Sequence, residues 1–153
     1  MNWLRWFKIK EIYFINGPNL NFLGIRDITQ YGTTNYDELK NLVNSEAKSL
    51  KIKTVFFQSN IEGEIVDYIQ ELINNQNSWI VINPGAYTHT SIAIRDALQT
   101  YSQNNKIVEV HISDINQREH FRKTNLISDI CNRSVIGKGV QGYVEAMEYI
   151  NEQ

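Results

Sequence analysis

The chain has few residues that could form disulfides or hold a metal. Its 153 residues include one cysteine, Cys131, and three histidines, His89, His111 and His120. One cysteine excludes an internal disulfide framework and any zinc site built from several thiolates. Three histidines scattered along the chain leave little for a histidine-rich site, so we expect no bound metal.

Long apolar runs and an excess of one charge are also lacking. The formal net charge is −2, which offers no electrostatic attraction for nucleic acid or for an anionic membrane. No apolar stretch approaches the about 20 residues of a membrane-spanning helix, and residues 1–8 lack the apolar core of a signal peptide. We therefore expect a cytoplasmic protein that has no nucleic-acid or membrane partner.

Proline is scarce, and no linker rich in glycine and serine divides the chain. The hydrophobic fraction of 42% and the charged fraction of 21% are typical of a globular protein. A length of 153 residues suits one domain. We therefore expect residues 1–153 to form a single domain.

Short β-rich runs alternate with amphipathic helical stretches. The β-rich runs cover residues 11–15, 53–57, 79–83, 106–111 and 134–136, and the helical stretches cover residues 36–50, 61–73, 91–101 and 140–150, with a short piece near 117–123. Residues 59–62 resemble a capping box, and Thr34 or Asn35 is the expected N-cap of the first helix. The alternation predicts an α/β fold: a flavodoxin-like, doubly wound, five-stranded parallel sheet with helices on both faces.

Polar side chains gather where the predicted strands end, which is where ligands bind in sheets of this kind. Asn19 follows the first strand, Asn83 and His89 follow the third, and His111 ends the fourth, with Arg122 further along. Guanidinium groups pair with carboxylates, while amides and imidazoles bind hydroxyls. The set therefore suits a small carboxylate that carries several hydroxyl groups.

A glycine motif near the end of the chain allows two interpretations. Residues 137–142 match the pattern GxGxxG between a predicted strand and a helix, which is typical of dinucleotide binding. The chain ends eleven residues after Gly142, so the further strand and the acidic residue of that signature are missing. We favour close packing of the last helix on the sheet over a nucleotide-binding module that holds a phosphate at the helix N-terminus.

Several motifs together resemble one enzyme family. They are residues 15–24 followed by Tyr31 and Gly32, residues 58–63, residues 83–91 followed by 95–97, residues 109–113 followed by 118–122, and residues 137–143. In order and spacing they resemble the type II 3-dehydroquinate dehydratases over residues 10–150. Residues 1–9 would then be an N-terminal extension.

The resemblance implies a reaction and an assembly. Members of this family remove water from 3-dehydroquinate to give 3-dehydroshikimate, a step of the shikimate and quinate pathways. The elimination is anti and passes through an enolate, with no metal, no cofactor and no Schiff base. The resemblance also implies a homododecamer, built as a tetramer of trimers.

The resemblance assigns five residues to catalysis. Tyr31 would be the base, and Arg26 would favour its phenolate form because a nearby cation stabilises negative charge. Asn19 would stabilise the enolate oxygen through a bound water. His111 would be the general acid, oriented by Glu109. These two residues are i and i+2 on a strand, so their side chains share one face.

The resemblance assigns six further residues to substrate binding. They are Asn83, His89 and Arg122 for the ring hydroxyls, Ile112 and Ser113 for the carboxylate, and Asp96, which would reach the site of a neighbouring subunit. Residues 24–33 would form a lid that moves in the absence of ligand, with Arg118 on its closing side.

The chain departs from the family pattern at Asp114 and at residues 123–125. A catalytically inactive family member with a scaffold role is a further alternative, which the complete catalytic set argues against.

Overall fold

The computed structural model describes residues 9–153 and shows one five-stranded sheet. The strands are β1 (Glu11–Asn16), β2 (Lys53–Gln58), β3 (Ser78–Asn83), β4 (Lys106–His111) and β5 (Arg133–Ile136). All neighbouring pairs are parallel, in the order β2-β1-β3-β4-β5. This is the predicted flavodoxin-like order, with its switch point between β1 and β3. The prediction of an N-terminal extension falls almost wholly on residues 1–8, outside the described residues.

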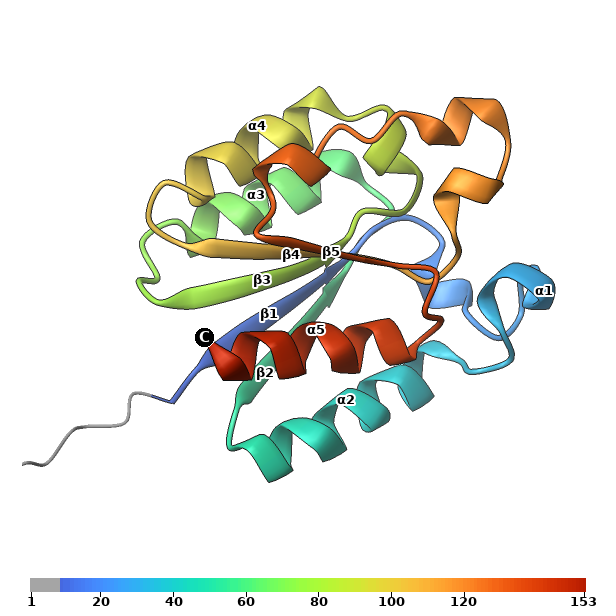
Figure 1. Cartoon of the computed structure of the whole chain (residues 1–153). Helices are drawn as coiled ribbons and strands as arrows, with labels where there is room; N and C mark the ends of the chain where they lie inside the picture. The colour runs from blue at the N-terminus through green and yellow to red at the C-terminus, as the bar shows by residue number, and fades with distance from the viewer. Residues whose placement is uncertain (1–8) are drawn as a thin grey trace, which may run out of the picture.

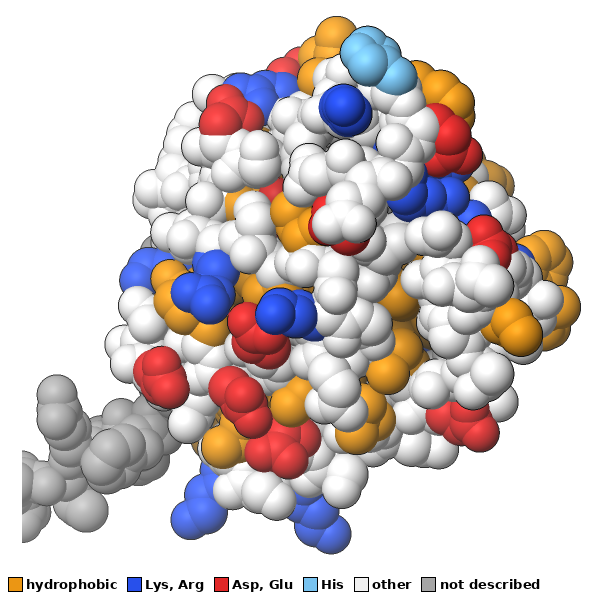
Figure 2. Space-filling view, turned by 45° about the vertical axis from the view of Figure 1, so that its right-hand side comes forward, with side chains coloured by type: hydrophobic (Ala, Val, Ile, Leu, Met, Phe, Trp, Pro, Cys, Tyr) orange, Lys and Arg blue, Asp and Glu red, His pale blue; other side chains and the backbone are white. Residues whose placement is uncertain are grey.

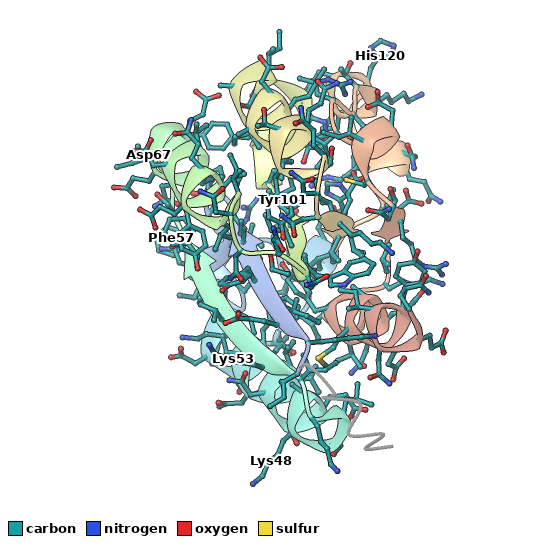
Figure 3. The ribbon with its side chains drawn as sticks, turned by 90° about the vertical axis from the view of Figure 1, so that its left-hand side faces the viewer. Lys48, Lys53, Phe57, Asp67, Tyr101 and His120 are labelled. Carbon is teal, nitrogen blue, oxygen red and sulfur yellow. The ribbon has the colours of Figure 1, made fainter. Side chains whose placement is uncertain are left out.

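Four helices cover the sheet, two on each face (Figure 1). Helices α2 (Tyr36–Leu50) and α5 (Gln141–Glu152) lie on one face, and α3 (Glu62–Leu72) and α4 (Ile92–Tyr101) lie on the other. The view turned by 90° shows helices on both sides of the sheet (Figure 3), and Tyr101 is buried in the core under α3 and α4. The predicted α/β fold class is therefore confirmed.

The three central strands β1, β3 and β4 are mostly apolar because both of their faces are buried. In β1, Ile12 and Phe14 pack into the core under α2 and α5, while Tyr13 and Ile15 pack into the core under α3 and α4. Successive side chains of a strand point to opposite faces, so one continuous apolar run supplies both cores.

The two predicted helix starts have different outcomes. Asn35 forms the capping box of α2: its Oδ1 accepts from the Glu38 amide at 2.9 Å, and Glu38 accepts from the Asn35 amide at 2.8 Å. The capping box predicted at residues 59–62 is wrong. Helix α3 begins at Glu62, and the Ser59 hydroxyl accepts from the Ile61 amide and donates to Glu64 instead. The Ser59 hydroxyl is therefore engaged in the turn before α3 and does not accept from a backbone amide of the helix, as a capping box would require.

Short irregular elements collect at the carboxyl ends of the strands, at the right of Figure 1. The predicted lid contains an unpredicted one-turn helix, α1 (Ile28–Tyr31). The piece predicted near residues 117–123 consists of two 3-10 turns, η3 (Ile115–Gln117) and η4 (His120–Lys123). A further 3-10 turn, η5 (Ser128–Ile130), precedes β5. Helix α1 and the turns η3 and η4 surround the carboxyl ends of the strands, where the polar residues lie, whereas η5 leads into the amino end of β5.

The glycine motif packs the last helix against the sheet. A Cβ on Gly142 would meet Cγ1 of Val110 in β4 and Cγ1 of Val135 in β5, each at 3.4 Å. Gly137 and Gly139 both have positive φ, a conformation that favours glycine. This geometry supports the packing interpretation of the motif.

Gly17 brings the loops after β1 and β3 into contact. A Cβ there would lie 2.2 Å from the carbonyl oxygen of Pro84, so Gly17→Ala must push two backbones apart. We expect a loss of about 1–3 kcal/mol in the free energy of unfolding, measured by urea titration. Gly63 in α3 is the matched control, because a Cβ there meets nothing within 4 Å. Gly63→Ala is expected to stabilise the protein, and a Gly17→Ala variant of normal stability would contradict the prediction.

Candidate active site

A cavity of about 120 Å³ opens at the carboxyl ends of β1, β3 and β4. Nine of the predicted site residues line it: Asn19, Arg26, Tyr31, Asn83, His89, His111, Ile112, Ser113 and Arg122. Arg118 also lines it, whereas Glu109 lies behind His111. The fold therefore brings residues from five separate segments to one cavity.

The phenol of Tyr31 lies between two guanidinium groups. Arg26 Nη2 donates to the Tyr31 oxygen at 3.1 Å, and Arg118 Nη1 donates to it at 2.7 Å. The Arg26 guanidinium also lies 4.3 Å from the centroid of the Tyr31 ring. Two cations at hydrogen-bond distance stabilise negative charge on the phenol oxygen. Arg118 thus has a direct contact that the sequence did not predict.

Glu109 and His111 form a buried pair at the end of β4. Glu109 Oε1 accepts from His111 Nε2 at 2.5 Å, and the Glu109 side chain is fully buried. Burial would raise the pKa of Glu109, but hydrogen bonds from His111, Ser134 and Asn125 lower it below the ordinary carboxyl value. The carboxylate is therefore ionised at neutral pH and holds the Nε2–H tautomer of His111. This leaves Nδ1 as the ring nitrogen for proton transfer.

His89 is held in its neutral form beside the cavity. Its Nδ1 lies 2.6 Å from the carbonyl oxygen of Thr124. Burial lowers the pKa of His89 from 6.5, and the positive charges of Arg122 and Arg118 and a protonated His111 lower it further, against the effect of the Thr124 carbonyl. A neutral ring that donates from Nδ1 keeps Nε2 as an acceptor for a hydroxyl group.

The lowered pKa of His89 predicts a pH-dependent stability. Between the folded pKa and 6.5 the unfolded state binds more protons, so stability rises with pH there and is lost as the pH falls below 6.5. Urea unfolding from pH 7.5 to 5 should therefore show a smaller decrease in His89→Gln than in the unsubstituted protein. Parallel curves for the two proteins would show that His89 is not the responsible group.

Asn83 is oriented by a buried tyrosine. Its Nδ2 donates to the Tyr143 hydroxyl at 3.0 Å, and that hydroxyl donates to Asn16 Oδ1 at 2.6 Å. Burial raises the pKa of Tyr143 far above its ordinary value, so the hydroxyl stays protonated. The Gly85 amide donates to Asn83 Oδ1, which completes the orientation of the Asn83 amide. No spacing signal in the sequence connects Asn16 with Tyr143, which lies 127 residues further along the chain.

The position of Asn19 is fixed by its backbone conformation and by a hydrogen bond from its backbone amide. Asn19 has φ of 66°, and its amide donates to Asn60 Oδ1 at 2.9 Å. The side-chain amide of Gln58 donates to the same Asn60 oxygen and to the Gly17 carbonyl. The loop after β2 thus supports the loop after β1, where Asn19 lines the cavity.

Two acidic residues lie away from this cavity. Asp96 is exposed on α4, beside a hollow between α3 and α4, and the structure does not bring it to the site of its own chain. Asp114 accepts from the Asn116 amide and caps η3, while its Cβ approaches Gly137.

The charge of the cavity is positive although the surrounding surface is mixed. The face in Figure 2 carries basic and acidic side chains interspersed with hydrophobic ones. Within the described chain, the cavity lining includes Arg26, Arg118 and Arg122 and no Asp or Glu.

Over residues 9–153, no group of three or more His, Cys, Asp or Glu could hold a metal ion. In the same residues, no helix combines the length and apolar character needed to cross a membrane.

These features describe an α/β protein with imidazole, phenol and guanidinium groups around a positively charged cavity at its sheet edge. The chain matches the family model "Dehydroquinase class II" over residues 10–151 and belongs to that family.

Relatives in sequence and in structure agree with this membership. A 3-dehydroquinate dehydratase of Caldicellulosiruptor saccharolyticus is 46% identical over 94% of this chain and 98% of its own. Another, of Lachnospira eligens, is 48% identical over 92% of this chain and 95% of its own. A crystal structure of the type II dehydroquinase from Butyrivibrio crossotus has a TM-score of 0.90 and 49% identity, covering 94% of this chain and 98% of that one.

Proposed function

We propose that this chain dehydrates 3-dehydroquinate to 3-dehydroshikimate by anti elimination, with Tyr31 as the base and His111 as the general acid. The activity follows from membership of the class II dehydroquinase family and from relatives with that activity. One observation supports the division of roles: the phenol between two guanidiniums and the Glu109–His111 pair line or adjoin the same cavity.

The first step is removal of a proton from the carbon beside the ketone. Tyr31 as phenolate takes this proton, and the electron pair moves to the ketone oxygen to give an enolate. Arg26 and Arg118 stabilise the phenolate, and Asn19 stabilises the enolate oxygen through a bound water. No amine of the protein bonds to the substrate, so no Schiff base forms.

The second step is loss of the hydroxyl group. The enolate returns its electron pair, the bond from carbon to the hydroxyl oxygen breaks, and His111 supplies the proton that makes it water. Glu109 stabilises the imidazolium before the transfer and holds the ring afterwards. Base and acid act from opposite faces of the ring, as anti elimination requires.

The remaining predicted residues bind the substrate. Asn83, His89 and Arg122 hold the ring hydroxyls, while Ile112 and Ser113 hold the carboxylate. The segment of residues 24–33 closes over the cavity, since it carries Arg26 and Tyr31, and its φ-positive Gly24 and Gly32 serve as hinges.

The predicted assembly belongs to the same proposal. In a homododecamer of four trimers, Asp96 on the exposed face of α4 would contribute to a neighbouring site. The single domain over residues 1–153 and the cytoplasmic location are also part of this proposal. Sedimentation of the purified protein tests the oligomer, and a monomer that is fully active would remove the role of Asp96.

An ultraviolet assay with 3-dehydroquinate tests the reaction. We expect the absorbance of the conjugated product to increase, both with and without EDTA. Enzyme treated with borohydride in the presence of substrate, then freed of both, should keep its activity. Inactivation by borohydride would indicate a Schiff base, and inhibition by EDTA would indicate a metal.

Labelled substrate tests the stereochemistry. Deuterium at either prochiral position of the carbon beside the ketone should be lost only when it lies anti to the departing hydroxyl. Loss of the syn label would contradict the arrangement of Tyr31 and His111 on opposite faces.

A further inference from the structure

The carboxylate of Glu109 has three side-chain donors. Its Oε1 accepts from His111 Nε2 at 2.5 Å and from Asn125 Nδ2, and its Oε2 accepts from the Ser134 hydroxyl at 2.7 Å. A fully buried carboxylate needs such donors, because burial without them favours the protonated form. Two of the three donors come from outside the Glu109–His111 pair.

Asn125 connects this carboxylate to the loop that follows η4. Its Oδ1 accepts from the backbone amides of Ile127 at 3.0 Å and Ser128 at 3.1 Å. Because both amides donate to Oδ1, the NH₂ group must face Glu109. The orientation of the Asn125 amide is thereby set from both sides.

The same loop also contacts the substrate-binding side of the cavity. The carbonyl of Thr124 accepts from His89, and the Leu126 amide donates to the Thr88 carbonyl at 3.0 Å. Residues 124–128 thus join the loop after β3 to the buried carboxylate at the end of β4.

We propose that Asn125 is a positioning residue: it fixes the carboxylate of Glu109 against His111 Nε2 and so presents the imidazole to the substrate. Ser134 has the same role on the other oxygen. The inference rests on the proposed function, and it gives a role to one of the residues at which the chain departs from the family pattern. Asn125 Nδ2 and His111 Nε2 both donate to Oε1 of Glu109. The hydrogen bond from Asn125 therefore reduces how strongly the carboxylate stabilises a protonated His111.

The charged and titratable groups around the pair come from several elements. His89, Arg118 and Arg122 lie on the cavity side, and Cys131 lies within electrostatic range of Glu109. Substitutions at Asn125 or Ser134 leave all of these groups in place. A changed pH profile can then be attributed to the donors of Glu109.

Three variants test the proposal through kcat and KM as functions of pH. Asn125→Ala and Ser134→Ala each remove a donor, so kcat should fall while KM changes less than about twofold. The alkaline limb of kcat should move to higher pH, because a carboxylate with fewer donors stabilises the imidazolium more strongly. Asn125→Asp keeps the acceptor for the two backbone amides but replaces the donor by a carboxylate oxygen. It should lower kcat at neutral pH at least about tenfold.

Asn35→Ala provides the matched control, since the Asn35 side chain caps α2 by accepting from the Glu38 amide and has no hydrogen bond to Glu109 or His111. It should lower thermal stability and leave the pH profile unchanged. An Asn125→Asp variant with unchanged kcat and an unchanged pH profile would overturn the proposal. A lower kcat in Asn125→Ala and Ser134→Ala without a shift of the alkaline limb would also overturn it. Asn125 would then serve only to hold its turn.

A spectroscopic measurement keeps this inference separate from the proposed reaction. In the NMR spectrum, the Nε2–H proton of His111 should lie far downfield and should move in Asn125→Ala but not in Asn35→Ala. This signal depends on the Glu109 contact and not on turnover. An unmoved signal contradicts the positioning role, whereas an absent dehydratase activity with a moved signal contradicts the reaction alone.

Discussion

Tyr31→Phe is expected to reduce kcat about 1,000-fold or more, which is within the range of positioned acid–base groups. The substitution removes only the oxygen that accepts from Arg26 and Arg118, and the ring keeps its place beside Arg26. The proposed mechanism has no other base that could take the carbon-bound proton once that oxygen is removed. Product formation in the ultraviolet assay measures the loss.

Binding by the same variant should be nearly normal. A cyclic inhibitor that mimics the enolate contacts the groups that hold the hydroxyls and the carboxylate, and Tyr31→Phe leaves these unchanged. Tyr149→Phe is the matched control, because Tyr149 packs edge-on against Trp79 away from the cavity. Turnover by Tyr31→Phe close to that of Tyr149→Phe would remove Tyr31 from the role of base.

His111→Gln is expected to have the second largest effect, a decrease in kcat of about 100-fold to 10,000-fold. The departing hydroxyl then lacks its proton donor, so KM should change much less than kcat. The variant also takes the imidazole from a buried carboxylate, which should cost about 1–3 kcal/mol in the free energy of unfolding.

His120→Gln distinguishes this effect from a general loss of histidine. His120 is exposed on η4 and projects away from the body of the protein (Figure 3). Its replacement should change neither kcat nor stability, measured by the same assay and by urea unfolding. If His111→Gln retained more than a tenth of the activity, another group would have to protonate the leaving hydroxyl.

Much of the fold could be predicted because local patterns carry it. The apolar runs of the strands and the spacing of buried residues such as Ile65 and Ile69 come from short stretches of chain. The errors fall where local chemistry offers more than one solution. The Ser59 hydroxyl accepts from the Ile61 amide in the turn before α3 and does not cap an amide of the helix. The predicted lid contains the one-turn helix α1, which has no strong sequence signal.

The candidate site was predictable to the extent that it lies at strand ends. In a parallel sheet all carboxyl ends meet at one edge, so residues after different strands converge there. The contacts between them were not predictable. Arg118 and Tyr31 are 87 residues apart, and Tyr143 and Asn16 are 127 apart, so no local period links them.

The sequence by itself determined the order of strands and helices, the apolar faces, the edge at which polar residues gather and the family to which they point. Only the tertiary structure decided which side chains form hydrogen bonds and ion pairs with one another. It placed a second guanidinium on Tyr31, a tyrosine behind Asn83 and an asparagine on Glu109. The reason is that hydrogen bonds act over about 3 Å between side chains that chain crossovers bring together, whereas sequence patterns report only near neighbours.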